Sequence, residues 1–326
     1  ETTGDPSGGS NFCGQFQKNG TSCQGSTATM SRRTLAILAA IGATTIYGIN
    51  HTVAKGVMPN YVQPFGFILL RVSGATLLFW LISLFGPKEK IDKKDWIRIV
   101  VCALLGMVIN MLSFFKGLQL STPINSAVLV TITPIFVVVL SAFFLKERIT
   151  LNKGLGVFLG FVGAIGLILF GAEVRQDAPN IPLGNFLFVI NATAYGAYLI
   201  VVKKLIEKYH PFTLMKWLFT IALIINLPIT LPDVLAMDWA SIPLWAYGSI
   251  AFVIIGTTFL TYLFNVFALT QLKASTIGAF MYMQPLVGIL FALFTGKDQL
   301  TLVKIVATLF VLVGVYLASK KPKPKI

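Results

Sequence analysis

The sequence predicts an all-α membrane protein with ten transmembrane helices, arranged as two inverted five-helix repeats. Three observations support this prediction. Of 326 residues, 56% are hydrophobic and only 12% are charged, whereas a soluble domain has about 25% charged residues. The mean hydropathy is +0.80. The apolar residues form long continuous runs, and similar stretches recur in the two halves of the chain. Most of the surface is therefore expected to face lipid.

A helix needs about 20 apolar residues to cross the hydrocarbon core, because each residue rises only about 1.5 Å. Ten segments meet this requirement. They are 34–56, 65–86, 96–118, 122–146, 153–171, 184–206, 212–231, 244–270, 275–296 and 301–319. The segments are continuously apolar and do not alternate, which favours helices over the strands of a membrane barrel.

The two ends of the chain differ from these segments. Residues 1–29 are rich in Gly, Ser, Thr and Gln and have no helical period, so we expect a disordered leader. Met30, followed by Ser31-Arg32-Arg33, resembles a natural start, which indicates that the leader is not native. Residues 320–326 form a basic tail. Residues 30–172 and 173–319 are then the two repeats.

The loops predict the orientation, because lysine and arginine concentrate in cytoplasmic loops. With the N-terminus inside, the inner loops and ends hold 17 such residues, and the outer loops hold only Arg175 and Lys297. Both termini are therefore expected in the cytoplasm. The net charge of +14 is spread over these short loops, which does not favour nucleic-acid binding.

The internal similarity has two parts. Residues 45–48 match residues 193–196 at an offset of 148, and this match continues to Val53 and Val201. Farther along, Pro134 matches Pro285 at an offset of 151. The residues that end these two segments, Lys146-Glu147 and Lys297-Asp298, match at the same offset. Each repeat holds five segments. Because five is odd, the second repeat must enter the membrane from the opposite side, as in many secondary transporters.

In order and spacing, these features resemble the drug/metabolite transporter superfamily, specifically its EamA-type proteins. The residues that carry the resemblance are Tyr47-Gly48-Ile49-Asn50, Lys55, Pro64, Arg71, Asn125-Ser126-Ala127, Thr133-Pro134, Leu145-Lys146-Glu147-Arg148-Ile149-Thr150, Ala274-Ser275, Gln284-Pro285 and Leu300-Thr301. The resemblance covers Met30 to Ser319. The second repeat departs from it at residues 296–299, where the sequence is Gly296-Lys297-Asp298-Gln299 and lacks a Glu-Arg pair. The resemblance implies a ten-helix transporter that exports or exchanges amino acids or related metabolites.

Polar residues inside the membrane are the candidate substrate-binding residues, because they are costly in hydrocarbon unless they face water or a protein partner. In the first segment, Tyr47 and His51 are four residues apart on one stripe, with Asn50 beside it. In the sixth, Asn191, Tyr195 and Tyr198 form a similar stripe. We expect both stripes to line a central cavity. The alternative is that the tyrosines pack helices and donate hydrogen bonds to carbonyl groups.

Two prolines lie inside the fourth and ninth segments. Pro134 and Pro285 each free the carbonyl group four residues earlier, and such groups either line a cavity or are satisfied by neighbours. The other reading is that each proline only kinks its helix. Polar residues near these breaks and elsewhere in the segments complete the candidate set: Thr131, Tyr282, Gln284, Asn110, Tyr262 and Asn265.

Three cations lie in the outer half of the first repeat. Lys55 and Lys116 are expected to extend to the outer headgroups. Arg71 lies deeper, so it is a candidate to attract an anionic group such as a carboxylate. No Asp or Glu lies in the interior of a segment, so proton or sodium coupling through a carboxylate has no evident residue. His51 is the one membrane-interior side chain that titrates near neutral pH, so coupling through His51 and uncoupled diffusion both remain open.

The sequence does not favour an enzyme. It contains only two histidines, and it lacks a glycine-rich nucleotide loop, so no metal or other cofactor is expected. We interpret the chain as an alternating-access carrier of small metabolites in a prokaryotic cytoplasmic membrane, with a small-molecule substrate and the lipid bilayer as its partners. The alternatives are a passive pore and a membrane receptor or scaffold that transports nothing. The sequence does not define the oligomeric state.

Overall fold

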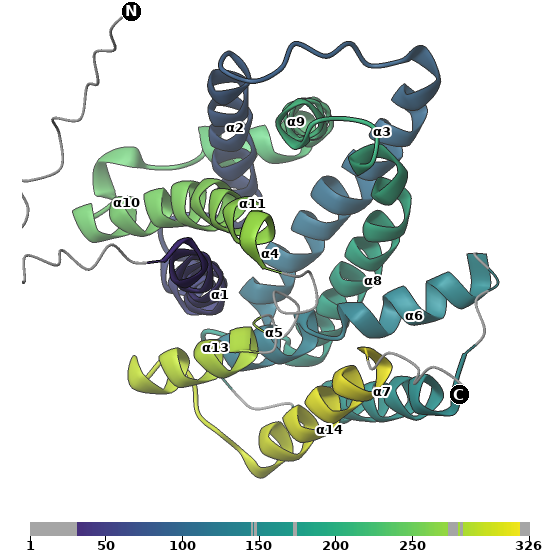
Figure 1. The fold of residues 1–326 in the computed structure, drawn as a ribbon. Coiled ribbons are helices and arrows are strands. Elements are labelled where there is room, and N and C mark those ends of the chain that lie inside the picture. The colour runs from purple at the N-terminus through teal and green to yellow at the C-terminus, as the bar shows by residue number, and fades with distance from the viewer. Residues whose placement is uncertain are drawn as a thin grey trace, which may run out of the picture.

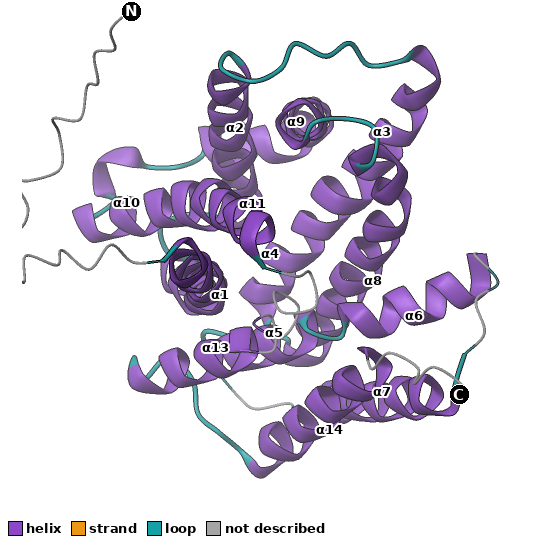
Figure 2. Ribbon diagram, viewed as in Figure 1, coloured by secondary structure: helices purple, strands orange, loops and turns teal. Residues whose placement is uncertain are grey.

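The computed structural model describes residues 31–144, 146, 149–171, 175–272, 280 and 283–319. The predicted leader (1–29) and the basic tail (320–326) lie outside the described residues. In the described part every regular element is a helix and no strand is present (Figure 2). Nine of the described helices are long and apolar enough to cross a membrane, and Met283–Phe294 is a shorter apolar helix. The prediction of an all-α membrane protein is therefore confirmed.

The helices follow the predicted order (Figure 1). Those of the first half are α1 (Arg32–Val57), α2 (Pro64–Ser83), η1 (Lys93–Asp95), α3 (Trp96–Ala103), η2 (Leu104–Ile109), α4 (Asn110–Leu120), α5 (Pro123–Val130), α6 (Thr133–Phe144) and α7 (Leu151–Phe170). Those of the second half are α8 (Ile181–Ile206), α9 (Pro211–Leu235), η3 (Trp239–Ser241), α10 (Leu244–Ala251), η4 (Phe252–Leu260), α11 (Thr261–Gln271), α13 (Met283–Phe294) and α14 (Leu302–Ser319). The third transmembrane helix comprises α3, η2 and α4, the fourth α5 and α6, and the eighth α10, η4 and α11.

Local sequence signals explain where several helices begin. The side chains of Thr122, Thr150 and Asn180 each accept a hydrogen bond from a backbone N–H of the following turn. Such caps satisfy donors that have no partner inside the helix. Pro123 and Pro211 occupy the first helical position, where a missing N–H costs nothing.

The fourth transmembrane helix is broken, whereas the sequence predicted a continuous segment over 122–146. A turn at Thr131 separates α5 from α6. Pro134 has no N–H for the carbonyl group of Val130, and the hydroxyl group of Thr133 donates to that carbonyl oxygen instead, at 2.8 Å. The hydroxyl group of Thr131 donates to the carbonyl oxygen of Val128 at 2.6 Å. The break is therefore satisfied by its own threonines.

The third and eighth transmembrane helices each contain a π-helical segment, which the sequence analysis did not predict. The flanking helices match in length: α3 and α10 have eight residues each, and α4 and α11 have eleven each. The π segments differ, because η2 has six residues and η4 has nine. This difference of three residues equals the change in sequence offset from 148 to 151.

Contacts between α2 and α9 show that these helices are antiparallel. The indole N–H of Trp80, near the end of α2, donates to the hydroxyl group of Thr220 in the first half of α9 at 2.9 Å. At the other end, the backbone N–H of Gly66 donates to the carboxylate of Asp233 at 3.3 Å. Figure 1 shows the two helices side by side.

Small residues allow α7 and α14 to approach closely. A Cβ atom on Gly156 would lie 2.5 Å from the backbone nitrogen of Ala318, and one on Gly163 would lie 2.7 Å from the carbonyl oxygen of Ala307. Because the residue numbers run in opposite directions, these helices are also antiparallel. They lie next to each other at the bottom of Figure 1.

A second pair of glycine contacts repeats across the two halves. A Cβ atom on Gly48 of α1 would lie 2.8 Å from Val287 and 2.9 Å from the carbonyl oxygen of Gln284. A Cβ atom on Gly196 of α8 would lie 3.3 Å from Phe136 and 3.5 Å from the carbonyl oxygen of Thr133. The two sets of contacts correspond in sequence. Gly196 follows Gly48 by 148 residues, whereas Val287 and Gln284 follow Phe136 and Thr133 by 151 residues.

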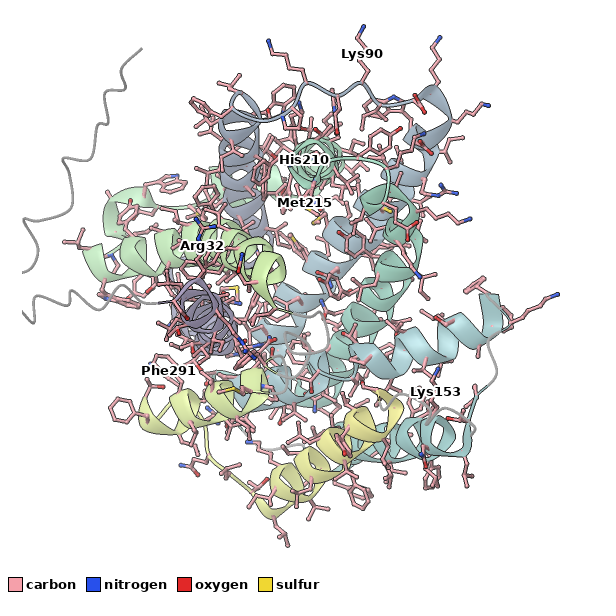
Figure 3. All side chains as sticks on the ribbon, viewed as in Figure 1. Arg32, Lys90, Lys153, His210, Met215 and Phe291 are labelled. Atoms are coloured by element: carbon pink, nitrogen blue, oxygen red, sulfur yellow. The ribbon has the colours of Figure 1, made fainter. Side chains whose placement is uncertain are left out.

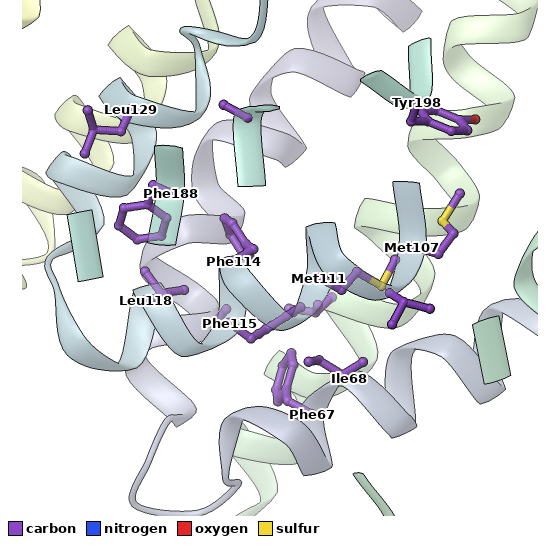
Figure 4. Packing of buried hydrophobic residues seen from close by; sticks show 14 of the residues in the cluster. Phe67, Ile68, Met107, Met111, Phe114, Phe115, Leu118, Leu129, Phe188 and Tyr198 are labelled. Atoms are coloured by element: carbon purple, nitrogen blue, oxygen red, sulfur yellow. The ribbon is translucent and has the colours of Figure 1, made fainter. Parts of the chain in front are cut away.

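Aromatic side chains pack between α2, α4 and α8 (Figure 4). The rings of Phe67 and Phe115 lie 5.2 Å apart between centroids, and those of Phe114 and Phe188 lie 6.2 Å apart. This apolar packing joins the first half of the chain to the sixth transmembrane helix, which carries the predicted tyrosine stripe.

Candidate functional site

The two predicted tyrosine stripes lie on α1 and α8. Tyr47 on α1 is partly buried and lies within electrostatic range of Tyr195 on α8. The rings of Tyr195 and Tyr198 stack with 5.5 Å between their centroids. Tyr198 lies against the π segment η2, because a Cβ atom on Gly106 would be 2.6 Å from its ring. A glycine is therefore needed at this position for the tyrosine to fit.

Asn110 and Asn191 join the third transmembrane helix to α8. The side-chain amide of Asn191 donates to the backbone carbonyl oxygen of Asn110 at 2.8 Å. In return, the side-chain amide of Asn110 donates to the backbone carbonyl oxygen of Asn191 at 3.4 Å. Hydrogen bonds of this kind hold membrane helices together. These two predicted residues therefore bridge helices at the edge of the tyrosine group.

Arg71 on α2 points toward the same group. Its Nε donates to the hydroxyl group of Thr258 in η4 at 3.0 Å, and its guanidinium lies 5.9 Å from the ring centroid of Phe115. The phenol of Tyr47 is within electrostatic range. Arg71 thus joins α2 to η4 and packs against α4.

His51 and Asn50, which follow Tyr47 on α1, are both buried. The Nδ1 of His51 is 2.7 Å from the hydroxyl oxygen of Ser126 on α5, and the ring packs edge-on against Phe114. The Oδ1 of Asn50 is buried and has no hydrogen-bond partner among the described residues. An unsatisfied buried acceptor is costly, so Asn50 is a position where a ligand donor would be stabilising.

The remaining predicted residues are placed less informatively. Asn265 on α11 and Gln284 on α13 are partly buried, and Pro285 is buried in α13 near the contact of that helix with Gly48. Tyr282 lies outside the described residues, as does the side chain of Tyr262. Among the described residues no group of His, Cys, Asp and Glu has the arrangement of a metal site.

Lys55 corrects the sequence-based expectation. It does not extend to lipid headgroups, because its ammonium group is buried and donates to the carbonyl oxygens of Leu118 at 2.8 Å, Gln119 at 2.9 Å and Asp177 at 2.6 Å. The first two carbonyl groups are at the end of α4, where the helix has no internal donors for them. Lys116 donates to the side chain of Gln119 at 2.7 Å and is partly buried.

An ionic group that was not predicted from the sequence surrounds the buried Asp298, and we call it the Asp298 cluster (Lys55, Arg175, Asp177, Asp298 and Lys304). The Asp298 carboxylate accepts hydrogen bonds from Lys304 Nζ at 2.9 Å, Arg175 Nη1 at 2.9 Å and the backbone N–H of Ile124 at 3.0 Å. The last bond caps the start of α5. Arg175 also binds the carboxylate of Asp177, and these bonds hold the pKa of Asp177 below its usual value.

A second cluster joins the loop before α3 to the loop after α8. The ammonium group of Lys208 donates to Asp92 and, at 2.6 Å, to Asp95. The hydroxyl group of Tyr209 donates to Asp95 at 2.7 Å. These bonds hold the pKa of Lys208 above its usual value. On the neighbouring stretch of the loop, Lys90 projects away from the helices (Figure 3).

Two further groups of polar residues inside the bundle were not among the predicted substrate-binding residues. Ser121 and Asn125 donate to the Oδ1 of Asn185 at 2.6 and 3.2 Å, which ties α5 to α8. Asn226 on α9 is fully buried, and neither atom of its amide has a partner among the described residues. Asn125 stood out only as part of the family resemblance, and Asn185 and Asn226 are single polar residues in apolar runs.

Comparisons with known proteins agree with this architecture. A model of the EamA-like transporter family matches residues 34–169 and residues 182–320. An uncharacterized transporter of Archaeoglobus fulgidus is 28% identical over 277 residues, which cover 85% of this chain and 96% of that protein. The uncharacterized transporter YyaM of Bacillus subtilis is 22% identical over 248 residues, which cover 76% and 81%. A solved crystal structure that is 16% identical has a TM-score of 0.58 and covers 88% of this chain and 98% of its own, a likeness of fold alone.

Proposed function

Because this chain belongs to the EamA-like transporter family, we propose that it is a secondary transporter that carries amino acids or related small metabolites by alternating access. The family and the names of the relatives point to a membrane transporter and not to an enzyme. The proposed passage lies between two inverted repeats, residues 30–172 and 173–319. The proposed location is a prokaryotic cytoplasmic membrane.

The repeated glycine contacts are the observation that carries this proposal. Gly48 touches α13 through Gln284 and Val287, and Gly196 touches α6 through the equivalent Thr133 and Phe136. Such matched contacts are expected if the two halves are related by a pseudo-twofold axis in the membrane plane, the arrangement that places substrate sites at the repeat interface. The antiparallel pairs α2–α9 and α7–α14 have the relative directions that this arrangement requires.

The ionic clusters agree with the proposed topology, because each cluster joins loops that this topology places on the same side of the membrane. The Asp298 cluster joins the end of α1, the turn between α4 and α5, the segment before α8 and the loop before α14. Positive-charge bias assigns all four segments to the outer side. The hydrogen bonds of Lys208 with Asp92 and Asp95 join two loops that the same bias assigns to the inner side.

The substrate would bind where α1, α2, α8 and η4 meet. Tyr47 and Tyr195 supply aromatic surfaces, Asn50 supplies an unpaired acceptor and Arg71 supplies a positive charge. Pockets lined by aromatic side chains with a few polar groups are typical of small-molecule sites.

Counterflow in proteoliposomes tests the proposal. Vesicles loaded with a mixture of unlabelled amino acids are diluted into trace isotope-labelled amino acids, and uptake is followed against protein-free vesicles. We expect saturable uptake that the internal amino acids accelerate. Tyr47→Ala and Tyr195→Ala should each lower it at least about tenfold, which corresponds to the loss of about 1.4 kcal/mol of binding.

Tyr316→Ala is the matched control, because Tyr316 on α14 is exposed on the surface of the bundle. Its uptake should equal that of the unmodified protein. Flux that rises linearly with concentration and is not accelerated from the opposite side would indicate a pore. Uptake no greater than that of protein-free vesicles for every amino acid would argue against the substrate class.

A further inference from the structure

Arg71 lies inside a membrane-spanning helix, and the contacts that it makes do not neutralise its positive charge. It is the eighth residue of α2, which begins at Pro64, so its Cα lies about 10 Å along the helix from that end. Its Nε binds Thr258, which is in the middle of the helix formed by α10, η4 and α11. The guanidinium is therefore directed toward the centre of the membrane. A side chain that extends to the headgroups would point the opposite way.

The positive charge of Arg71 has no carboxylate partner in the described part of the chain. None of the ion pairs formed there includes it, and neither terminal nitrogen of its guanidinium donates to a described residue. The predicted segments contain no Asp or Glu, and the carboxylate of Asp233, near the end of α9, accepts a hydrogen bond from the backbone N–H of Gly66. By contrast, the buried ammonium group of Lys304 is paired with Asp298. An unpaired charge inside a membrane is costly and marks functional positions.

The contacts that Arg71 does make leave its charge available. Thr258 accepts a hydrogen bond from Nε, which fixes the side chain but leaves both terminal nitrogens without an acceptor among the described residues. Phe115 provides the face of an aromatic ring rather than an anion. The guanidinium is planar and its remaining donors match the two oxygens of a carboxylate. In the second half of the chain, the position 148 residues later is Phe219, which stacks on Phe79, so the feature occurs once per chain.

We infer that Arg71 binds the carboxylate group of the transported solute, so that the substrates are carboxylic acids and not amines or neutral compounds. This inference rests on the proposed function and specifies the substrate chemistry of that site. Asn50, three residues after Tyr47 on α1, leaves Oδ1 free to accept a hydrogen bond from a second group of the solute, such as an amino group. Thr258 is a positioning residue for Arg71.

Efflux from proteoliposomes containing the full chain tests this inference. The vesicles are loaded with an equimolar mixture of the common amino acids, the amines that differ from them by loss of the carboxyl group and the acids that differ by loss of the amino group. Mass spectrometry follows what leaves. We expect every exported compound to carry a carboxylate. Arg71→Gln should slow its export at least about tenfold, because a charge-assisted bond is lost, and Arg71→Lys should be intermediate.

A second measurement separates a binding role from a structural one. If Arg71 serves the solute, Arg71→Gln should not lower the unfolding temperature of the ligand-free protein, because an unpaired and partly buried charge is removed. It should abolish the stabilisation by the exported acids that the unmodified protein shows. Lys116→Gln is the control, since Lys116 is another partly buried cation of the first half that is already bonded to Gln119. It should leave export unchanged.

The outcomes distinguish the two ideas. Export of amines or neutral compounds, or unchanged export of acids by Arg71→Gln, would overturn the role of Arg71 while leaving a transporter in place. A lowered unfolding temperature of ligand-free Arg71→Gln, with stabilisation by acids retained, would also overturn it. Absence of any efflux above that of protein-free vesicles would contradict the proposed function and the inference with it.

Discussion

Replacing Asp298 with asparagine should destabilise the protein more than any other single change of an acidic residue in the described part of the chain. Asparagine keeps the size of the side chain and an oxygen acceptor for the backbone N–H of Ile124. It removes the negative charge that faces Lys304 and Arg175. The side chains of Asp298 and Lys304 are both 0% exposed, and that of Arg175 is 20% exposed.

The expected magnitude follows from this burial. When one partner of a buried ion pair is removed, the remaining charge stays out of water without its counter-ion, at a cost of about 3–5 kcal/mol. Asp177→Asn is the matched control. It removes a carboxylate that also binds Arg175, but the side chain of Asp177 is 54% exposed, so a loss of about 0–1 kcal/mol is expected. The two variants should therefore differ by at least about thirtyfold in the unfolding equilibrium constant.

Unfolding in mixed micelles with increasing sodium dodecyl sulfate, followed by proteolysis of the unfolded fraction, measures this difference. The double variant Asp298→Asn, Lys304→Met should lose less stability than the sum of the two single variants, because the second change removes the unpaired charge. Equal stability of Asp298→Asn and Asp177→Asn would refute the reasoning.

Two further predictions concern close packing and acid. Gly314→Ala should destabilise the α7–α14 pair by about 1–3 kcal/mol, because its Cβ would lie 2.6 Å from the backbone nitrogen of Gly160. Gly166→Ala, which meets no atom within 4 Å, should be neutral or stabilising by up to about 1 kcal/mol in the same micelle assay. The folded-state pKa of Asp177 is lowered, chiefly by the hydrogen bonds from Arg175. Its contribution to stability is therefore present above its usual carboxyl pKa and is lost as the pH falls through the folded-state value. Between about pH 5 and about pH 3 the unmodified protein should lose more stability than Asp177→Asn, and parallel curves would contradict this.

The transmembrane helices were predictable because each depends on the length and polarity of its own residues. The run from 153 to 171 corresponds to α7 at Leu151–Phe170, and that from 184 to 206 to α8 at Ile181–Ile206. The break between α5 and α6 was partly foreseen from Pro134. The π segments were not, since residues 104–109 have no sequence signal that separates a π-helix from an α-helix in an apolar run.

The side-chain roles were less predictable because they depend on which helices become neighbours. Tyr47 and Tyr195 were paired through the internal similarity, and the structure places them within electrostatic range of each other. Lys55 was misjudged, because the carbonyl groups that bind it come from residues more than 60 positions away. The importance of Asp298 was hidden for the same reason, although an Asp beside an apolar run in a departure from the family pattern was an available signal.

The unequal π segments have a consequence for how this chain tolerates changes in length. An inserted residue turns every following side chain of a helix by about 100°, which would carry polar groups of α11 into lipid. Three residues turn them by about 300°, and the wider π-helix can take up the remainder over its own length. Removing three residues from η4 would make it as long as η2, whereas removing one or two would turn the side chains of α11 away from their present directions. A deletion of three residues inside η4 should therefore be tolerated better than a deletion of one or two.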